Sequence, residues 1–359
     1  MQLYEVIPER VEEINRQIAK LDRWLTSSAV FSGGAIAGSI DESGYALYTY
    51  PEISGYYFSY LAYWIQSDGD GEYLAEKAQK VLGYQQQMWS KSSPPATRLY
   101  LNTVLQSQAD WRNQGLFIFD LAMLVRGVAD ISLYIDTTSW PVPTLLNYID
   151  GFWDGYKLNP VRWFTGRPEG APDRWSTRSG AYQLKVVAAL KRAAVTWNSS
   201  ILIEKIAPVQ AALLHDFNQG NFIAHNPHSI AYALEGVVLL GDRNDVNWDV
   251  GKMWIENLAG AVDGAAHDDI DFRRVDVIAQ LLRLSCCEPF FNVSIADRLY
   301  QLLCSALNAD GSFHFTLPPC NVTYKNTWPV LFARQALDFY RRVCLTGNGL
   351  SIKEMRCLF

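Results

Sequence analysis

Two carboxylates stand at the openings of long apolar stretches of the sequence. Glu52 lies in YPEISGYYFSYLAYW, and Asp276 lies in DFRRVDVIAQLLRL. Two carboxyl groups at one site can act as general acid and general base, as in the cleavage of a glycosidic bond. The adjacent Arg273 and Arg274 would hold Asp276 ionised, as a base or a nucleophile requires. The alternative is that both acids only cap the first turn of a helix.

Polar and aromatic side chains precede the other apolar stretches. AHNPHS supplies His225 and His228, and His228 could remove a proton or bind a sugar hydroxyl. QADWRNQG and DRWSTRSG each combine tryptophan with arginine, which suits stacking on a sugar ring and binding of a carboxylate or phosphate. Ordinary loop packing is the alternative. The candidate substrate ligands are Tyr56, Tyr57, Asp110, Trp111, Arg112, Trp175, Arg178, His225, Arg273, Arg274, Asn326 and Trp328.

Patterns for metal or nucleotide chemistry are missing from the sequence. The acidic stretch HDDID (residues 267–271) is either solvated surface or a cation site, and it lacks the spacing of an EF-hand loop. No HExxH or CxxC pair occurs, nor does GxSxG, GxGxxG or GxxxxGK[ST]. We therefore expect no metal and no cofactor.

Composition limits the class of protein and its partners. The chain has 359 residues, of which 49% are hydrophobic and 19% are charged, and its net charge is −6. No basic stripe favours nucleic acid, and no stretch reaches the roughly 18 apolar residues of a membrane span. The charged N-terminus lacks the apolar core of a signal peptide. We expect a reduced, cytoplasmic protein whose partner is a small-molecule or glycan substrate.

Apolar helical stretches recur through the sequence. Their opening residues can be set at Ser54, Gln114, Ser179, Ser229, Asp276 and Trp328, which gives gaps of 60, 65, 50, 47 and 52 residues. Amphipathic stretches alternate with them and begin at Pro8, Gly71, Thr144, Ser199, Asn247 and Asn292. Strand patterns are sparse. This alternation predicts an all-α fold built from an internal repeat.

A helix that is apolar on all sides must be covered on all sides. Six such helices can share one ring, with the amphipathic helices outside it. The sequence therefore predicts an (α/α)6 toroid formed by residues 1–359 as one domain. A straight solenoid of helical hairpins is the competing arrangement. In the toroid the inner helices run parallel, so Glu52 and Asp276 would face one rim.

These features resemble the six-hairpin glycosidase-like toroids, which include glycoside hydrolases, polysaccharide lyases and sugar epimerases. YPEISGY and DGSF (residues 310–313) are also similar to segments of toroid proteins associated with bacterial polysaccharide assembly. The resemblance lies in architecture, because no catalytic signature matches residue for residue. It implies acidic catalytic groups in the loops before the inner helices or in their first turns.

Three functions follow as hypotheses. The first is a carbohydrate-active enzyme acting on an oligosaccharide or polysaccharide precursor, by hydrolysis with Glu52 and Asp276 or by lyase or epimerase chemistry with His228 or a tyrosine as base. The second is a terpenoid or polyene cyclase, a family that also has a double ring of helices, but HDDID lacks the DxDD spacing of its acid. The third is a non-catalytic glycan-binding module. A cyclase predicts a closed, apolar cavity, whereas a sugar enzyme predicts several charges.

Overall fold

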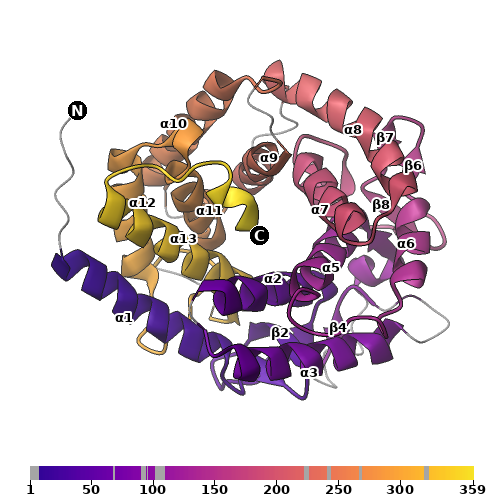
Figure 1. Ribbon diagram of the computed structural model, residues 1–359, viewed down its shortest axis with the longest axis horizontal. Coiled ribbons are helices and arrows are strands. Elements are labelled where there is room, and N and C mark those ends of the chain that lie inside the picture. The colour runs from indigo at the N-terminus through magenta and orange to yellow at the C-terminus, as the bar shows by residue number, and fades with distance from the viewer. Residues whose placement is uncertain are drawn as a thin grey trace.

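The apolar stretches of the sequence form the inner ring of a double ring of helices (Figure 1). The computed structural model describes residues 8–67, 69–89, 94, 96–101, 110–221, 226–240, 244–266, 269–318 and 323–359. The inner helices are α2 (Pro51–Ser67), α5 (Ile118–Ile131), α7 (Gln183–Thr196), α9 (Pro227–Leu240), α11 (Val275–Ser285) and α13 (Thr327–Thr346). Each inner helix contacts the next, and α13 contacts α2, so the ring is closed.

The amphipathic stretches form the outer ring (Figure 1). Its helices are α1 (Pro8–Leu25), α3 (Gly71–Trp89), α6 (Val142–Asp150), α8 (Ser200–Asn218), α10 (Trp248–Gly264) and α12 (Val293–Ala306). The starts of α8 and α12 are capped by Ser199 and Asn292. The side chains of these two residues accept hydrogen bonds from backbone N–H groups in the first turn of each helix. The predicted (α/α)6 toroid is confirmed.

Burial explains the division between the two rings. Every residue of α11 is buried, whereas α1 buries only one side, including Ile14, Leu21 and Leu25. A close approach within the inner ring joins α2 and α5 at Gly55 and Gly127. A Cβ atom added to Gly127 would lie 2.1 Å from the Gly55 carbonyl oxygen, so only glycine fits there.

Two inner helices begin later than the sequence predicts. The expected openings at Gln114 and Ser179 become Ile118 and Gln183. Before α5, the chain forms a short 3₁₀ turn, η1 (Trp111–Gln114), and then strand β5 (Gly115–Phe117), which pairs with β8 (Val161–Trp163). A tertiary strand pairing therefore replaces the first helical turn.

Short strands surround the end of the ring at which the inner helices begin. An antiparallel sheet contains β1 (Phe31–Ser32), β2 (Ala35–Ile40), β3 (Ala46–Thr49), β4 (Leu99–Tyr100) and β9 (Lys325–Asn326). Strand β3 leads into α2, and β9 leads into α13. A second hairpin pairs β6 (Trp153–Asp154) with β7 (Lys157–Leu158), and further 3₁₀ turns are η2 (Trp175–Thr177), η3 (Glu288–Phe290) and η4 (Glu354–Cys357).

The C-terminal segment lies in the centre of the ring, at the end where the inner helices finish (Figure 1). Met355, Leu358 and Phe359 are buried. Arg126 of α5 donates a hydrogen bond to the Leu358 carbonyl oxygen, and Arg283 of α11 donates one to the Phe359 oxygen at 2.7 Å. The segment thus closes the ring opposite the strands.

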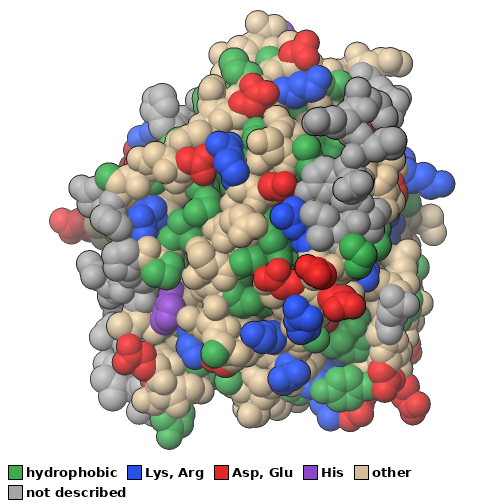
Figure 2. Space-filling view, turned by 90° about the vertical axis from the view of Figure 1, so that its left-hand side faces the viewer, with side chains coloured by type: hydrophobic (Ala, Val, Ile, Leu, Met, Phe, Trp, Pro, Cys, Tyr) green, Lys and Arg blue, Asp and Glu red, His purple; other side chains and the backbone are tan. Residues whose placement is uncertain are grey.

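One face of the outer surface carries mixed charge. On the face shown in Figure 2, the acidic and basic side chains of the described residues are interspersed. Among the described helices, none combines the length and the hydropathy that crossing a membrane requires.

The contact between α2 and α5 can be tested by adding one methyl group. Gly127→Ala should destabilise the fold by about 1–3 kcal/mol, because the new Cβ atom overlaps the backbone of α2. Gly83→Ala on outer helix α3 is the matched control, since its Cβ would meet no atom within 4 Å. Denaturant unfolding of both variants measures the difference. Equal stabilities would refute the close approach.

Candidate active site

A cavity of about 120 Å³ opens where the inner helices begin. Its walls come from the first turns of α2, α5, α9, α11 and α13, or from the residues just before them, and from η2 before α7. Residues that are distant in sequence therefore meet at one end of the ring. Several predicted residues line the cavity, namely Glu52, Trp111, Arg112, Trp175, His228, Arg274 and Trp328.

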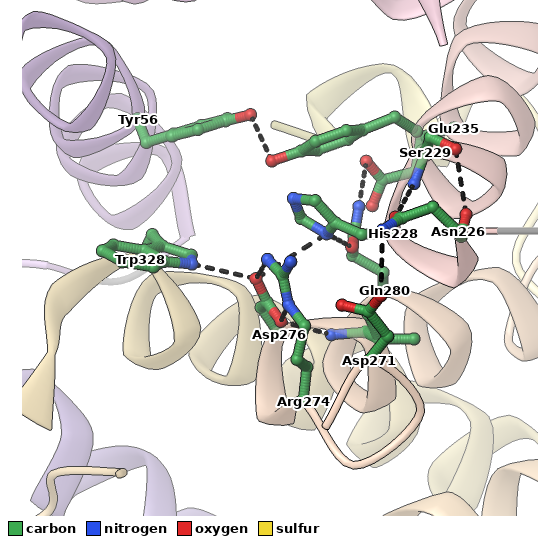
Figure 3. A network of polar contacts seen from close by, with 12 residues as sticks. Tyr56, Asn226, His228, Ser229, Glu235, Asp271, Arg274, Asp276, Gln280 and Trp328 are labelled. Carbon is green, nitrogen blue, oxygen red and sulfur yellow. Dashed lines mark hydrogen bonds and ion pairs between the residues drawn. The ribbon is translucent and has the colours of Figure 1, made fainter. Parts of the chain in front are cut away.

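Asp276 is fully buried directly beside the cavity (Figure 3). Its carboxylate accepts two hydrogen bonds from Arg274, at 3.0 and 2.6 Å, and one from the Trp328 indole at 2.9 Å. Burial alone would raise the pKa of Asp276, but the charge of Arg274 and these hydrogen bonds outweigh it and hold the pKa well below its usual range. Asp276 is thus an ionised anchor that positions Arg274 and Trp328.

His228 is held by a relay of hydrogen bonds (Figure 3). The Gln280 amide nitrogen donates to the Glu235 carboxylate at 3.2 Å, so the Gln280 oxygen faces Nδ1 of His228 at 2.9 Å. Because that oxygen can only accept, Nδ1 must carry the proton and Nε2 keeps its lone pair. Burial lowers the pKa of His228 to about 3, and the charge of Arg274 adds to this shift. The ring is therefore neutral and can accept a hydrogen bond.

Glu52 and Asp120 form a second acidic group in the cavity. Burial raises the pKa of Glu52 well above its ordinary value, and repulsion from Asp120 raises it further. Burial raises the pKa of Asp120 to about 7, although a hydrogen bond from Tyr50 and the charges of Arg112 and Arg98 oppose the shift. The buried Oδ2 atom of Asp120 has no hydrogen-bond partner in the described residues. Burial therefore favours the protonated form of both acids, and repulsion between the two carboxylates opposes a state in which both are ionised.

Beneath the cavity, charged side chains lie fully buried. Lys185 of α7 and Arg283 of α11 both bind the Glu235 carboxylate. Above them the Tyr56 hydroxyl donates to the Tyr232 hydroxyl at 3.3 Å. Burial lowers the pKa of Lys185 to about 7, while the attraction of Glu235 opposes the shift. These pairs keep Glu235 in place and so support the Gln280–His228 relay above it.

Other predicted residues lie outside the cavity wall. Tyr57 donates its hydroxyl to the Leu25 carbonyl, and Arg273 donates to the Leu317 and Pro318 carbonyls. Arg178 is exposed and pairs with Asp173.

The remaining predicted residues lie around or beneath the cavity, or outside the described part. Asp110 caps η1 and binds Arg112 at 3.2 Å. Asn326 is fully buried in β9, and Tyr56 lies beneath the cavity. His225 lies outside the described residues, as do His267 and Asp268 of the acidic stretch. No group of three His, Cys, Asp or Glu side chains in the described ranges is arranged to hold a metal ion.

Several lining residues were not predicted as ligands. They are Tyr48, Tyr50, Arg98, Phe117, Asp120, Arg174, Ser176 and Tyr232. Asp120 lies in the first turn of α5, as Glu52 does in α2, but the sequence placed the start of this helix at Gln114. Arg174 stands directly beside the predicted Trp175. Tyr48 lies in strand β3, and Arg98 directly precedes strand β4. The helical pattern of the sequence therefore could not indicate that these two residues line the cavity.

A larger cavity of about 610 Å³ lies at the opposite end of the ring. It is lined by the ends of α2, α5 and α13 and by the C-terminal segment. Its charged groups are largely paired with each other, as in Arg192–Asp130, Arg341–Asp338 and Arg342–Glu354. Acids with raised pKa values and an unpartnered carboxyl oxygen occur in the smaller cavity, which is therefore the better candidate for chemistry.

Asp276 should be essential for stability. Asp276→Asn leaves the buried Arg274 without its counter-charge, and removing one partner of a buried ion pair costs about 3–5 kcal/mol. The exposed Asp271, which accepts one hydrogen bond from Asn226 at 3.4 Å, provides the control variant Asp271→Asn. Urea unfolding compares the two. A loss no larger than that of Asp271→Asn would contradict the anchoring role.

Glu52 should make the folded protein less stable as pH rises, whereas an ion-paired acid makes it more stable. The pKa of Glu52 is higher in the folded than in the unfolded chain, so its contribution is complete below about pH 4.3 and is lost as pH rises toward the folded pKa. Glu52→Gln should therefore match the wild type in melting temperature near pH 4 and exceed it increasingly up to pH 8. The exposed Glu72 serves as control through Glu72→Gln. A constant difference across this range would contradict the raised pKa.

Comparison with solved structures finds the same arrangement across nearly the whole chain. D-mannose isomerase matches with a TM-score of 0.64 at 11% identity, covering 92% of this chain and 97% of that one. Cellobiose 2-epimerase from Bacillus thermoamylovorans matches with 0.62 at 12% identity, covering 94% and 100%. An unsaturated glucuronyl hydrolase specific for heparin matches with 0.59 at 11%, covering 93% and 97%.

The sequence itself gives no such match. No protein-family model and no curated protein matches the chain. At 11–12% identity the structural likeness establishes the fold alone. The protein therefore has the (α/α)6 toroid fold that these structures share.

Proposed function

We propose that this protein is a carbohydrate-active enzyme that cleaves the glycosidic bond of a terminal sugar by general acid and base catalysis. One observation carries the proposal: Glu52 and Asp120 line the same small cavity, burial raises the pKa of both, and their mutual repulsion favours the state in which one is protonated while the other is ionised. Two carboxyl groups in different protonation states are what glycoside hydrolysis requires. The proteins of similar fold include an isomerase, an epimerase and a glucuronyl hydrolase of sugars.

The two acids have different roles in this mechanism. Protonated Glu52 donates its proton to the glycosidic oxygen as the bond breaks. Ionised Asp120, with its unpartnered Oδ2 atom, activates water or attacks the sugar directly. Asp276, which the sequence indicated as the base, is fully engaged by Arg274 and Trp328. We therefore place the second catalytic role on Asp120.

The cavity also favours a small, polar substrate. Typical ligand pockets have about 300–1,000 Å³, whereas this one has about 120 Å³, which suits one sugar unit rather than several. Trp111, Trp175 and Trp328 contribute aromatic surface for the ring of a sugar. The arginines in the wall oppose the apolar cavity of a polyene cyclase. The unpartnered Asp120 oxygen also opposes a binding module whose acids are only capped.

Sugar epimerisation or isomerisation is a second candidate, because the relay through Gln280 leaves Nε2 of His228 unprotonated. Figure 3 shows this nitrogen on the side of the ring that faces away from Gln280. A base at that position could remove a proton next to a carbonyl group. The low pKa of His228 makes it a weak base, so hydrolysis remains the first proposal.

Replacing each acid by its amide tests the mechanism. On a panel of nitrophenyl glycosides, Glu52→Gln and Asp120→Asn should each lower kcat/KM at least 10²-fold while the fold is retained, because each removes a proton-transfer group. Glu72→Gln should keep full activity. The rate should rise with pH through about 7 as Asp120 ionises and fall at higher pH as Glu52 ionises. The two limbs report the pair rather than single residues.

The same assays decide between the candidates. Full activity of both amide variants would refute the acid–base pair. Incorporation of solvent deuterium into a sugar without bond cleavage, abolished by His228→Asn, would favour epimerisation or isomerisation instead.

A further inference from the structure

Arginine side chains converge on the candidate active site from separate segments of the chain. The cavity is lined by Arg98, Arg112, Arg174 and Arg274. Arg274 is paired with Asp276 at 2.6 Å. Arg98 and Arg112 share the single carboxylate of Asp110, at 3.7 and 3.2 Å. Asp120 lies near Arg98 and Arg112 as well, because their charges lower its pKa. Three of the four guanidinium groups are therefore accompanied by an acid of the site.

Of the four arginines in the cavity wall, Arg174 is the one that forms no ion pair with an acid among the described residues. Its Nε atom is buried and makes no hydrogen bond. Burial lowers the pKa of Arg174, and the charges of Arg112 and Arg274 lower it further. A partly buried guanidinium repelled by its neighbours is unfavourable unless an anion occupies the space between them. In the described part of the chain, no carboxylate fills that place.

A second unsatisfied donor lies next to Arg174. The indole nitrogen of Trp175 is also buried without a hydrogen-bond partner. Its ring is fixed by edge-on contacts with Tyr182 at 5.0 Å and His228 at 5.6 Å between ring centroids. Arg174 and Trp175 therefore both line the cavity, each with a donor that has no acceptor, and buried donors of this kind need one.

The geometry points to a substrate that carries an oxyanion on its sugar unit: the carboxylate of a sugar acid, or a phosphate or sulfate ester. Arg174 binds the oxyanion with Arg112, and Trp175 donates to the same group or to the ring beside it. Guanidinium groups suit such anions because their parallel N–H donors match two oxygens. This inference rests on the proposed function, since it places the anion in the cavity that holds Glu52 and Asp120.

Calorimetric titration of the wild-type protein tests this without any variant. The probes are D-glucuronate, D-glucose 1-phosphate and neutral D-glucose. At least one charged sugar should bind tenfold or more tightly than glucose, and raising the salt concentration should reduce that preference. Preference for glucuronate identifies a carboxylate, and preference for glucose 1-phosphate identifies a phosphate. Equal binding of all three sugars would overturn the proposal.

Two arginine variants locate the binding group. Arg174→Gln should remove the preference for the charged sugar, at least tenfold, and Arg174→Lys should restore part of it because charge returns without the paired donors. Arg178→Gln is the matched control, because Arg178 is exposed, pairs with Asp173 and lies outside the cavity wall. An unchanged preference in folded Arg174→Gln would overturn the proposal, and circular dichroism establishes folding.

The outcome is separable from that of the catalytic proposal. Glu52→Gln should keep the preference for the charged over the neutral sugar, because Glu52 does not hold the anion. Loss of turnover in Glu52→Gln together with an unchanged preference in Arg174→Gln would refute only the anion site. Full turnover in Glu52→Gln with loss of the preference in Arg174→Gln would refute only the acid–base pair.

Discussion

Helices that are apolar on every side must be buried on every side, and they achieve this by packing against one another. In this protein they do so as a closed ring whose members all point in one direction. Six helix N-termini therefore meet at one end, each with free N–H groups and the positive end of a helix dipole. Glu52, Asp120 and Asp276 all occupy first turns at this end. Acids gather there because the helix ends lower the cost of burying them.

Equivalent positions on the ring nevertheless produce different chemistry. Asp276 receives two donors from Arg274 and one from Trp328, and it stays ionised. At Glu52, burial and repulsion from Asp120 outweigh the attraction of Lys185 and Arg274, so its pKa is raised. Burial thus acts on both acids, but only one is compensated. The separation of an anchoring acid from a proton donor arises from the residues around each helix end rather than from the helix itself.

The sequence was sufficient for the ring because helical periodicity is a local property. It predicted the alternation of inner and outer helices and the shared rim of Glu52 and Asp276. Asp120 was missed because the second inner helix was expected to open at Gln114. Pairing of Gly115–Phe117 with Val161–Trp163 delays that helix to Ile118, and this long-range contact leaves no local pattern. Only then does Asp120 become a first-turn acid.

Side-chain partners were the least predictable part of the site. Asp173, Arg174 and Arg178 lie close together in sequence, and any pairing among them was open. The structure pairs Asp173 with Arg178, outside the cavity, which leaves Arg174 in the wall without a counter-charge. Such choices depend on the directions of side chains in loops, which composition and spacing do not encode.

The buried segment around Leu358 and Phe359 also limits how a long substrate could be handled. It fills the middle of the ring and is tied to α5 and α11 by Arg126 and Arg283. Under the function proposed above, a polysaccharide strand would find this segment across the axis of the ring. It would have to enter and leave the candidate active site from the end at which the inner helices begin.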